Sequence, residues 1–273
     1  MHRGGDGSEV EREALGLLDA DERPPFLLTN PGARSPFLFV GDHAGRAVPR
    51  SLGSLGLQQA QLDRHIGWDI GVAALGRSLA LAMEACFIEQ RFSRLVIDCN
   101  REPSRDDSIV TVSDGSDVFG NFDLEPEARR LRREAIFDPY HGAIAAELDL
   151  RLALGLPTIL VALHSFTPAL SSVTQARPWT YGVLHLNDSR FSRAMIERLR
   201  AEPDGPIVGD NQPYQMDLVD YTIPAHSQAR GLDYLELETR QDLLADEMAV
   251  LRVTQRLARV LPEALASLES QAP

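Results

Sequence analysis

The chain has 273 residues, with 27 basic and 40 acidic side chains and a formal net charge of −13. Hydrophobic residues make up 44% and charged residues 25%, which excludes collagen, a coiled coil and a disordered tail. The acidic balance argues against a nucleic-acid-binding protein, which usually carries a basic stripe, and against docking on an anionic membrane.

The start of the chain predicts neither a membrane span nor a secretory signal. No apolar run approaches the roughly 20 residues that a span requires. The first 21 residues are polar and acidic, without a basic region followed by an apolar one. We expect residues 1–25 to form a flexible acidic arm and residues 26–273 to form a single domain.

The two cysteines, Cys86 and Cys99, both lie in apolar runs. Two buried and reduced thiols are typical of a cytoplasmic protein, which is the localisation that we expect. Two cysteines cannot by themselves form a Cys-based zinc site.

From residue 26 onward, short apolar runs alternate with helical patterns, which predicts an α/β fold with a largely parallel sheet. Asp138 and Pro139 are predicted to be the N-cap and first residue of a helix. The stretch 103–124 predicts a loop long enough to be functional. The predicted strands are 37–41, 85–89, 95–99, 157–163, 181–186 and 233–239. The predicted helices are 69–83, one opening at 138, 190–201 and one at the C-terminus.

Several polar residues follow the predicted strands, where such sheets bind ligands. His43 follows the strand 37–41, and His164 follows the strand 157–163. Histidines and a carboxylate at strand ends are what a three-ligand zinc site requires. The chain has no His-Glu-x-x-His run, so any ligands come from separate segments.

Two further pairs belong to the same predicted edge of the sheet. Asn100 and Arg101 follow the strand 95–99. Glu236 and Glu238 share one face of the strand 233–239, because alternate residues of a strand point the same way.

Dispersed segments of the chain resemble the N-formylglutamate amidohydrolase family and, more distantly, the zinc carboxypeptidase and aspartoacylase group. They follow the family's order over roughly residues 26 to 250. The matching segments are Gly41-Asp42-His43-Ala44-Gly45, residues 63–71, residues 94–101, Pro139-Tyr140-His141, Leu163-His164-Ser165 and residues 238–242.

This resemblance implies a single-domain, three-layer α/β/α fold with a mixed, mostly parallel sheet, as in zinc exopeptidases. It also implies hydrolysis of N-formyl-L-glutamate, or a related N-acyl amino acid, by a zinc-activated water. The products would be glutamate and formate, and the reaction belongs to histidine catabolism.

The resemblance further implies that His43, Asp69 and His164 hold one Zn²⁺ or another divalent ion. An Asp at the start of a helix can instead cap it. The carboxypeptidase pattern places Glu three residues after the first histidine, where this chain has Arg46. Asp63 and His65 therefore stay open as alternatives for the third ligand.

By the same resemblance, Glu238 is the general base, with Glu236 as the alternative. Arg94 would polarise the scissile carbonyl oxygen, or else pair with Asp98. Asn100 and Arg101 would hold the substrate's α-carboxylate, since a guanidinium matches a carboxylate bidentately.

His226 and Arg240 complete the expected substrate-binding residues, although His226 could equally be a loop histidine and Arg240 could pair with Glu236 or Glu238. His141 shares a helical stripe with apolar residues, which favours a hydrogen-bonded core position.

The expected partner is a small anionic N-acyl amino acid, with neither nucleic acid nor membrane, and a homo-oligomer stays open. A carboxypeptidase-like peptide hydrolase and a non-catalytic carboxylate-binding protein on the same fold are the alternative functions.

Overall fold

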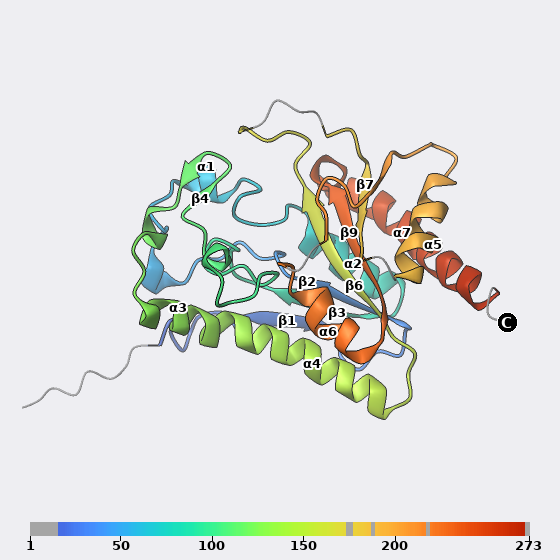
Figure 1. Ribbon diagram of the computed structural model, residues 1–273, viewed down its shortest axis with the longest axis horizontal. Helices are drawn as coiled ribbons and strands as arrows, with labels where there is room; N and C mark the ends of the chain where they lie inside the picture. The colour runs from blue at the N-terminus through green and yellow to red at the C-terminus, as the bar shows by residue number, and fades with distance from the viewer. Residues whose placement is uncertain (1–15, 173–176, 187–188, 217–218, 271–273) are drawn as a thin grey trace, which may run out of the picture.

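The structure is a computed structural model that describes residues 16–172, 177–186, 189–216 and 219–270. Its centre is a seven-stranded sheet in the order β1-β3-β2-β6-β9-β7-β8 (Figure 1). The strands are β1 (Phe26–Thr29), β2 (Phe37–Gly41), β3 (Cys86–Gln90), β6 (Ile159–Phe166), β7 (Tyr181–Leu184), β8 (Val208–Asp210) and β9 (Asp233–Arg240).

The four central strands β3, β2, β6 and β9 are mutually parallel. At the edges, β1 runs antiparallel to β3, and β7 runs antiparallel to β9 with β8 parallel beside it. The carboxyl ends of the four central strands therefore meet at one edge of the sheet, which is where such sheets bind ligands.

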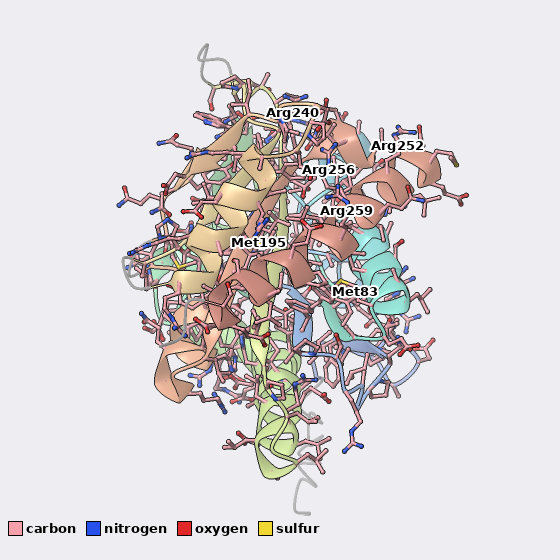
Figure 2. The ribbon with its side chains drawn as sticks, turned by 90° about the vertical axis from the view of Figure 1, so that its right-hand side faces the viewer. Met83, Met195, Arg240, Arg252, Arg256 and Arg259 are labelled. Carbon is pink, nitrogen blue, oxygen red and sulfur yellow. The ribbon has the colours of Figure 1, made fainter. Side chains whose placement is uncertain are left out.

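Helices cover both faces of the sheet, so the predicted three-layer fold is confirmed. One face packs on α2 (Val72–Ala82), α5 (Arg190–Arg200) and α7 (Glu247–Glu269), which Figure 2 shows side by side with Met195 on α5 and Arg259 on α7. The opposite face packs on α4 (Asp138–Ala153) (Figure 1). The remaining helices are the short α1 (Gln59–Leu62), α3 (Pro126–Arg132) and α6 (Thr222–His226).

The alternation of strand residues decides which face each side chain enters. Phe39 and Val161 lie in the core under α2, α5 and α7. Val40 and Ala162 lie in the core under α4. Ala162 pairs in register with Glu236, and His164 pairs with Glu238, so both glutamates and His164 face the α4 side at the end of the strands.

The predicted strand 95–99 is wrong, because this buried segment consists of turns. Its polar backbone groups are satisfied without a strand partner: Ser93 Oγ accepts a hydrogen bond from Leu95 N at 3.2 Å, and Asp98 N donates to Ser108 O at 2.7 Å. A short apolar run gives no periodicity that separates a strand from a buried turn segment.

Two differences between the predicted and observed boundaries involve residues named above. Strand β6 continues to Phe166, so His164 lies inside the strand rather than after it. Asp138 is not an N-cap, because α3 passes through a π-helical stretch, η4 (Arg133–Phe137), directly into α4. Asp138 instead pairs with Arg133, at 3.1 Å. Pro139 has no N–H for the helix ladder, and a widened turn before it accommodates that loss.

The loop predicted over 103–124 carries only short elements: the 3-10 turns η2 (Asp106–Ser108) and η3 (Phe119–Asn121) and the hairpin of β4 (Val112–Ser113) and β5 (Ser116–Asp117). The other 3-10 turns are η1 (Arg50–Leu52), η5 (Gln228–Arg230) and η6 (Gln241–Leu244).

The predicted acidic arm lies partly outside the described residues, which begin at residue 16. Its described part is docked on the domain rather than free. Leu17 is buried, and its carbonyl accepts a hydrogen bond from Ser51 Oγ at 2.8 Å. Arg50 pairs with Asp19 and Asp21 of the same segment. Within the described residues, no helix is long and apolar enough to cross a bilayer.

Candidate active site

Three buried side chains from separate segments meet at the carboxyl edge of the central strands. His43 follows β2 by two residues, Asp69 precedes α2, and His164 lies on β6. Each is only 3% exposed. The backbone links the first two, because Asp69 N donates a hydrogen bond to His43 O at 2.9 Å.

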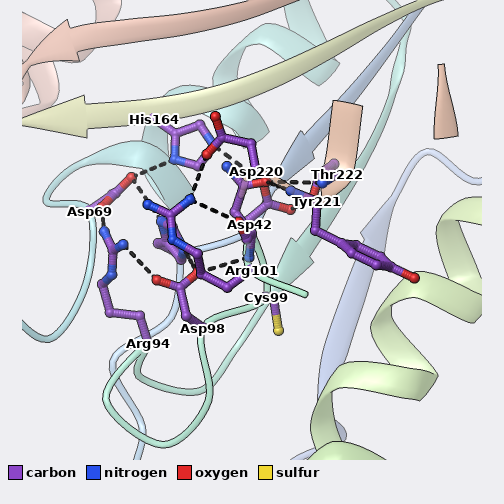
Figure 3. A network of polar contacts seen from close by, with 12 residues as sticks. Asp42, Asp69, Arg94, Asp98, Cys99, Arg101, His164, Asp220, Tyr221 and Thr222 are labelled. Atoms are coloured by element: carbon purple, nitrogen blue, oxygen red, sulfur yellow. Dashed lines mark hydrogen bonds and ion pairs between the residues drawn. The ribbon is translucent and has the colours of Figure 1, made fainter. Parts of the chain in front are cut away.

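The same nitrogen of each imidazole faces the Asp69 carboxylate. Asp69 Oδ2 lies 3.0 Å from His164 Nδ1 and 3.6 Å from His43 Nδ1. Ligand atoms of the three residues all lie within 4.8 Å of one another. Figure 3 shows His164 pointing at Asp69. The N-cap of α2 is Gly71, and the Asp69 carboxylate instead accepts a hydrogen bond from Ser165 N at 3.2 Å, which contradicts the capping alternative.

The far nitrogen of each imidazole meets a second carboxylate. His43 Nε2 lies 2.7 Å from Asp98 Oδ1, and His164 Nε2 lies 3.2 Å from Asp42 Oδ2. A carboxylate behind a ligating histidine fixes its tautomer and orientation.

These two supporting carboxylates are themselves held in place. Asp42 Oδ1 accepts hydrogen bonds from the hydroxyls of Tyr140 and Thr222, both at 2.8 Å. Asp98 Oδ1 accepts one from Asn100 N at 2.9 Å.

The electrostatics of the cluster suit a cation. Burial opposes the protonated form of both histidines, yet Asp98 and Asp69 raise the pKa of His43, and Asp42 and Asp69 raise the pKa of His164. Burial likewise opposes ionisation of Asp69, but the two histidines hold its pKa well below the ordinary range. Three buried carboxylates thus favour positive charge between them.

A divalent ion fits this donor set. Among the described residues, buried His43 Nδ1 has no hydrogen-bond partner although it faces Asp69. Two imidazole nitrogens and one carboxylate oxygen are the ligands of a catalytic zinc site with an open fourth position.

The other two candidates for the third ligand lie elsewhere. Asp63 is half-exposed and pairs with Arg46 at 3.2 Å. His65 lies with Nε2 3.4 Å from Asp114 Oδ2 and is not part of the cluster. Of the three candidates for the third metal ligand, Asp69, Asp63 and His65, the geometry therefore favours Asp69.

A cavity of about 540 Å³ opens beside the cluster. Glu236 and Glu238 both line it, and one carboxylate oxygen of each has no hydrogen-bond partner in the described part of the chain. Burial raises the pKa of Glu238 to about 7 and that of Glu236 well above its ordinary range. Gly182 of β7 lies opposite Glu238 of β9 in the strand register. A Cβ atom at Gly182 would lie 2.2 Å from Gln212 O, so this position has no room for a side chain.

Arg94, predicted to polarise the scissile carbonyl, and Asn100 and Arg101, predicted to bind the substrate, also line this cavity. Arg94 Nη2 donates to Asp98 Oδ2 at 2.7 Å, which is the pairing left open as its alternative (Figure 3). Arg101 Nη1 donates to Asp220 Oδ1 at 2.6 Å. Both arginines thus carry a carboxylate partner before any substrate binds.

Asn100 also holds the segment that follows. Its side-chain oxygen accepts hydrogen bonds from Tyr221 N at 3.1 Å and Thr222 N at 2.9 Å. Only its amide N–H groups are therefore left to donate to a ligand.

His226 and Arg240, both predicted to bind substrate, do not line the cavity. The His226 ring stacks on His141, with its Nε2 3.0 Å from His141 Nδ1. Arg240 lies at the half-buried end of β9, where it pairs with Asp242 at 2.7 Å and donates to the carbonyl of Trp179 at 3.3 Å. The core position predicted for His141 is confirmed by its 2.8 Å contact with Cys99 O.

Sequence reasoning missed four residues at the site. Asp42 and Asp98 lie inside matched segments, next to His43 and before Asn100, so those segments could have pointed to them. Arg177 and Tyr214 line the cavity from stretches without periodicity or a matched motif, and only the fold brings them there.

Comparisons with known proteins identify a matching family and similar solved structures. The family model described as N-formylglutamate amidohydrolase matches residues 35–245. The crystal structure of gene product Atu2144 from Agrobacterium tumefaciens aligns with a TM-score of 0.88 and 33% identity, over 93% of this chain and 99% of that one.

The N-formylglutamate amidohydrolase from Ralstonia eutropha JMP134 aligns with a TM-score of 0.66 and 19% identity, over 91% of this chain and 100% of that one. At that identity the likeness concerns the fold alone. A search of curated proteins returned no match. The family match covers most of the chain, and the chain therefore belongs to the N-formylglutamate amidohydrolase family.

Proposed function

We propose that the protein hydrolyses N-formyl-L-glutamate, or a closely related N-acyl amino acid, with one zinc ion held by His43, Asp69 and His164. The observation that carries the proposal is the unbonded, buried His43 Nδ1 that faces Asp69 beside an arginine-lined cavity. A zinc ion held there would polarise the amide carbonyl and lower the pKa of a water molecule.

In this proposal Glu238 is the general base that takes the proton from the attacking water and later gives it to the leaving amine. A base works best when its pKa lies near the working pH. Before any ion binds, the pKa of Glu238 is about 7, close to a neutral working pH, whereas burial raises the pKa of Glu236 well above its ordinary range.

The cavity arginines would bind and orient the substrate. Arg94 lies next to the cluster, with Nη1 3.5 Å from Asp69 Oδ1, and is placed to stabilise charge that develops on the carbonyl oxygen. Arg101 uses Nη1 for Asp220, and a guanidinium has five N–H donors, so others remain for the substrate α-carboxylate together with the Asn100 amide. The reaction would belong to histidine catabolism in the cytoplasm.

The test is hydrolysis by purified protein loaded with Zn²⁺. N-Formyl-L-glutamate should yield equal amounts of formate and glutamate, and a chelator should abolish the reaction until Zn²⁺ is restored. Turnover of dipeptides instead would indicate a carboxypeptidase. No turnover together with no bound metal would indicate a non-catalytic carboxylate-binding protein and overturn the proposal.

A matched pair of variants tests the third ligand. Asp69→Asn should lose both metal and activity, because an amide is a far weaker zinc ligand than a carboxylate. Asp63→Asn changes a half-exposed carboxylate that pairs with Arg46 and should keep both. Metal content is measured on the purified proteins, and retention of zinc by Asp69→Asn would contradict the ligand set.

A further inference from the structure

Arg177, which has no role in the proposed chemistry, lines the same cavity as the His43–Asp69–His164 cluster. Its guanidinium has neutral partners. Nη1 donates to the Tyr214 hydroxyl at 2.8 Å and to the Thr167 carbonyl at 3.5 Å. The guanidinium carbon also lies 4.8 Å from the centre of the Tyr214 ring, so the charge is held over an aromatic ring.

The other arginines of the cavity already have carboxylate partners. Arg94 pairs with Asp98, and Arg101 pairs with Asp220. Within the described ranges of the chain, Arg177 has no carboxylate at ion-pair distance. No carboxylate of the described residues therefore compensates the positive charge of Arg177, and this charge is available to a ligand.

The other residues that line the cavity include several acidic side chains, so an anionic ligand needs a positive charge there to bind. Its lining includes the carboxyl groups of Asp69, Asp98, Asp114, Asp220, Glu236 and Glu238. A second carboxylate on the substrate would enter this acidic surface, where it loses hydration and meets like charges. A cation without a carboxylate partner offsets that cost most fully, and a guanidinium does so with two parallel hydrogen bonds.

Arg177 is held at a more exposed part of the cavity lining than the two histidines. His43 and His164 are 3% exposed, whereas Tyr214, which holds Arg177, is 42% exposed. A ligand whose acyl group lies at the buried histidines would extend its far end toward Tyr214 and Arg177. In an N-acyl amino acid, the group farthest from the amide is the end of the side chain.

We propose that Arg177, held by Tyr214, binds the side-chain carboxylate of the substrate and selects dicarboxylic N-acyl amino acids over neutral ones. This inference rests on the proposed amidohydrolase function. It adds the residue that distinguishes a glutamate side chain from its uncharged amide.

The test compares N-formyl-L-glutamate with N-formyl-L-glutamine, which has nearly the same shape without the charge. The zinc-loaded wild type should prefer the glutamate compound in kcat/KM by at least tenfold, the scale of one charge-assisted hydrogen bond. Arg177→Met should abolish that preference by raising KM for the glutamate compound, with kcat/KM for the glutamine compound nearly unchanged. Arg177→Lys should retain part of the preference, since it keeps the charge but not the fork.

The matched control is Arg190→Met, which changes an exposed arginine that pairs with Asp233 outside the cavity and should keep the wild-type preference. Thermal unfolding of each variant verifies that it is folded. An equal loss on both substrates would assign Arg177 to the α-carboxylate and overturn the inference. An unchanged preference in Arg177→Met would overturn it as well, while the hydrolysis itself would stand.

Binding gives a second readout that does not need turnover. Calorimetry should show that wild type binds L-glutamate at least tenfold more tightly than L-glutamine and that Arg177→Met does not distinguish them. If wild type hydrolyses neither formyl compound, the proposed function fails. In that case the binding comparison still decides the inference, since equal affinities in wild type would refute it.

Discussion

Single residues at the site differ mainly in what surrounds their ionisable atoms. Glu236 and Glu238 have the same side chain, lie two residues apart and face the same way, yet burial and neighbouring charges affect their pKa values differently. His164 lowers both values, and Arg94 and His43 also lower that of Glu238. The sequence predicts that two glutamates share a face, but the pattern does not reveal which one ionises near neutral pH.

The two glutamine variants should therefore behave differently. Glu238→Gln removes the proposed base, and the expected loss is on the order of 10²- to 10⁴-fold in kcat with metal content retained. Glu236→Gln resembles the protonated acid that burial favours, so its loss should be less than about tenfold. Near-wild-type kcat in Glu238→Gln would transfer the base role to Glu236.

The pH dependence of kcat/KM in the wild type also tests whether Glu238 is the base. A base must be ionised to act, so kcat/KM should rise as pH increases through the pKa of Glu238 and level off above it. Without a metal that pKa is about 7, and a bound cation nearby lowers it. The acidic limb of the profile should thus have its midpoint between about 4.5 and about 7, and Glu238→Gln should lack this limb.

At the scale of elements, the site depends on how the segment after β2 packs. Gly45 follows His43 by two residues, and a Cβ there would lie 2.0 Å from the backbone carbonyl carbon of Arg91. Ala47 N also donates to Arg91 O at 3.3 Å. The segment that carries His43 is thus pressed directly against the backbone that follows β3.

Gly45→Ala should force these two segments apart. We expect the free energy of unfolding to fall by about 1–3 kcal/mol, the usual cost of overpacking, and zinc affinity to fall with it. Gly142→Ala is the control, because a Cβ there meets nothing within 4 Å on helix α4 and alanine favours a helix by about 1 kcal/mol. Urea unfolding measures both, and equal stability of Gly45→Ala and wild type would contradict this packing argument.

Elements differ in how far their sequence defines them. The runs that became β2, β6 and β9 are long, apolar or alternating, and they were predicted with only small boundary errors. The 95–99 segment is as apolar but is buried through turns, since its hydrogen bonds go to Ser93, Ser108 and neighbouring backbone. Local pattern does not encode such tertiary partners, which is also why Arg177 and Tyr214 were not found.

For the whole molecule, the metal ligands connect distant parts of the chain. His43, Asp69 and His164 come from the start, the first third and the middle of the sequence, and they join β2, the segment before α2, and β6. An ion bound by all three would cross-link β2, the segment before α2 and β6. Binding to the folded state alone stabilises it by mass action.

Removing the metal should therefore lower Tm. At an ion concentration about a thousand times Kd, the linkage amounts to about 4 kcal/mol, so a chelator should reduce Tm by several degrees. Asp69→Asn should show no chelator effect, because it binds no ion from the outset. A wild-type Tm that is the same with Zn²⁺ and with chelator would be incompatible with a site that includes all three residues.

The cluster is held in shape by the protein itself. Each imidazole is anchored from behind by a carboxylate, Asp69 is bonded to the backbone of His43, and β6 is the middle strand of the sheet. A rigid frame of two nitrogens and one oxygen cannot widen to surround a large ion. Calcium, which takes six to eight oxygen ligands at longer distances, should consequently be rejected by size and ligand chemistry, even where it greatly outnumbers zinc.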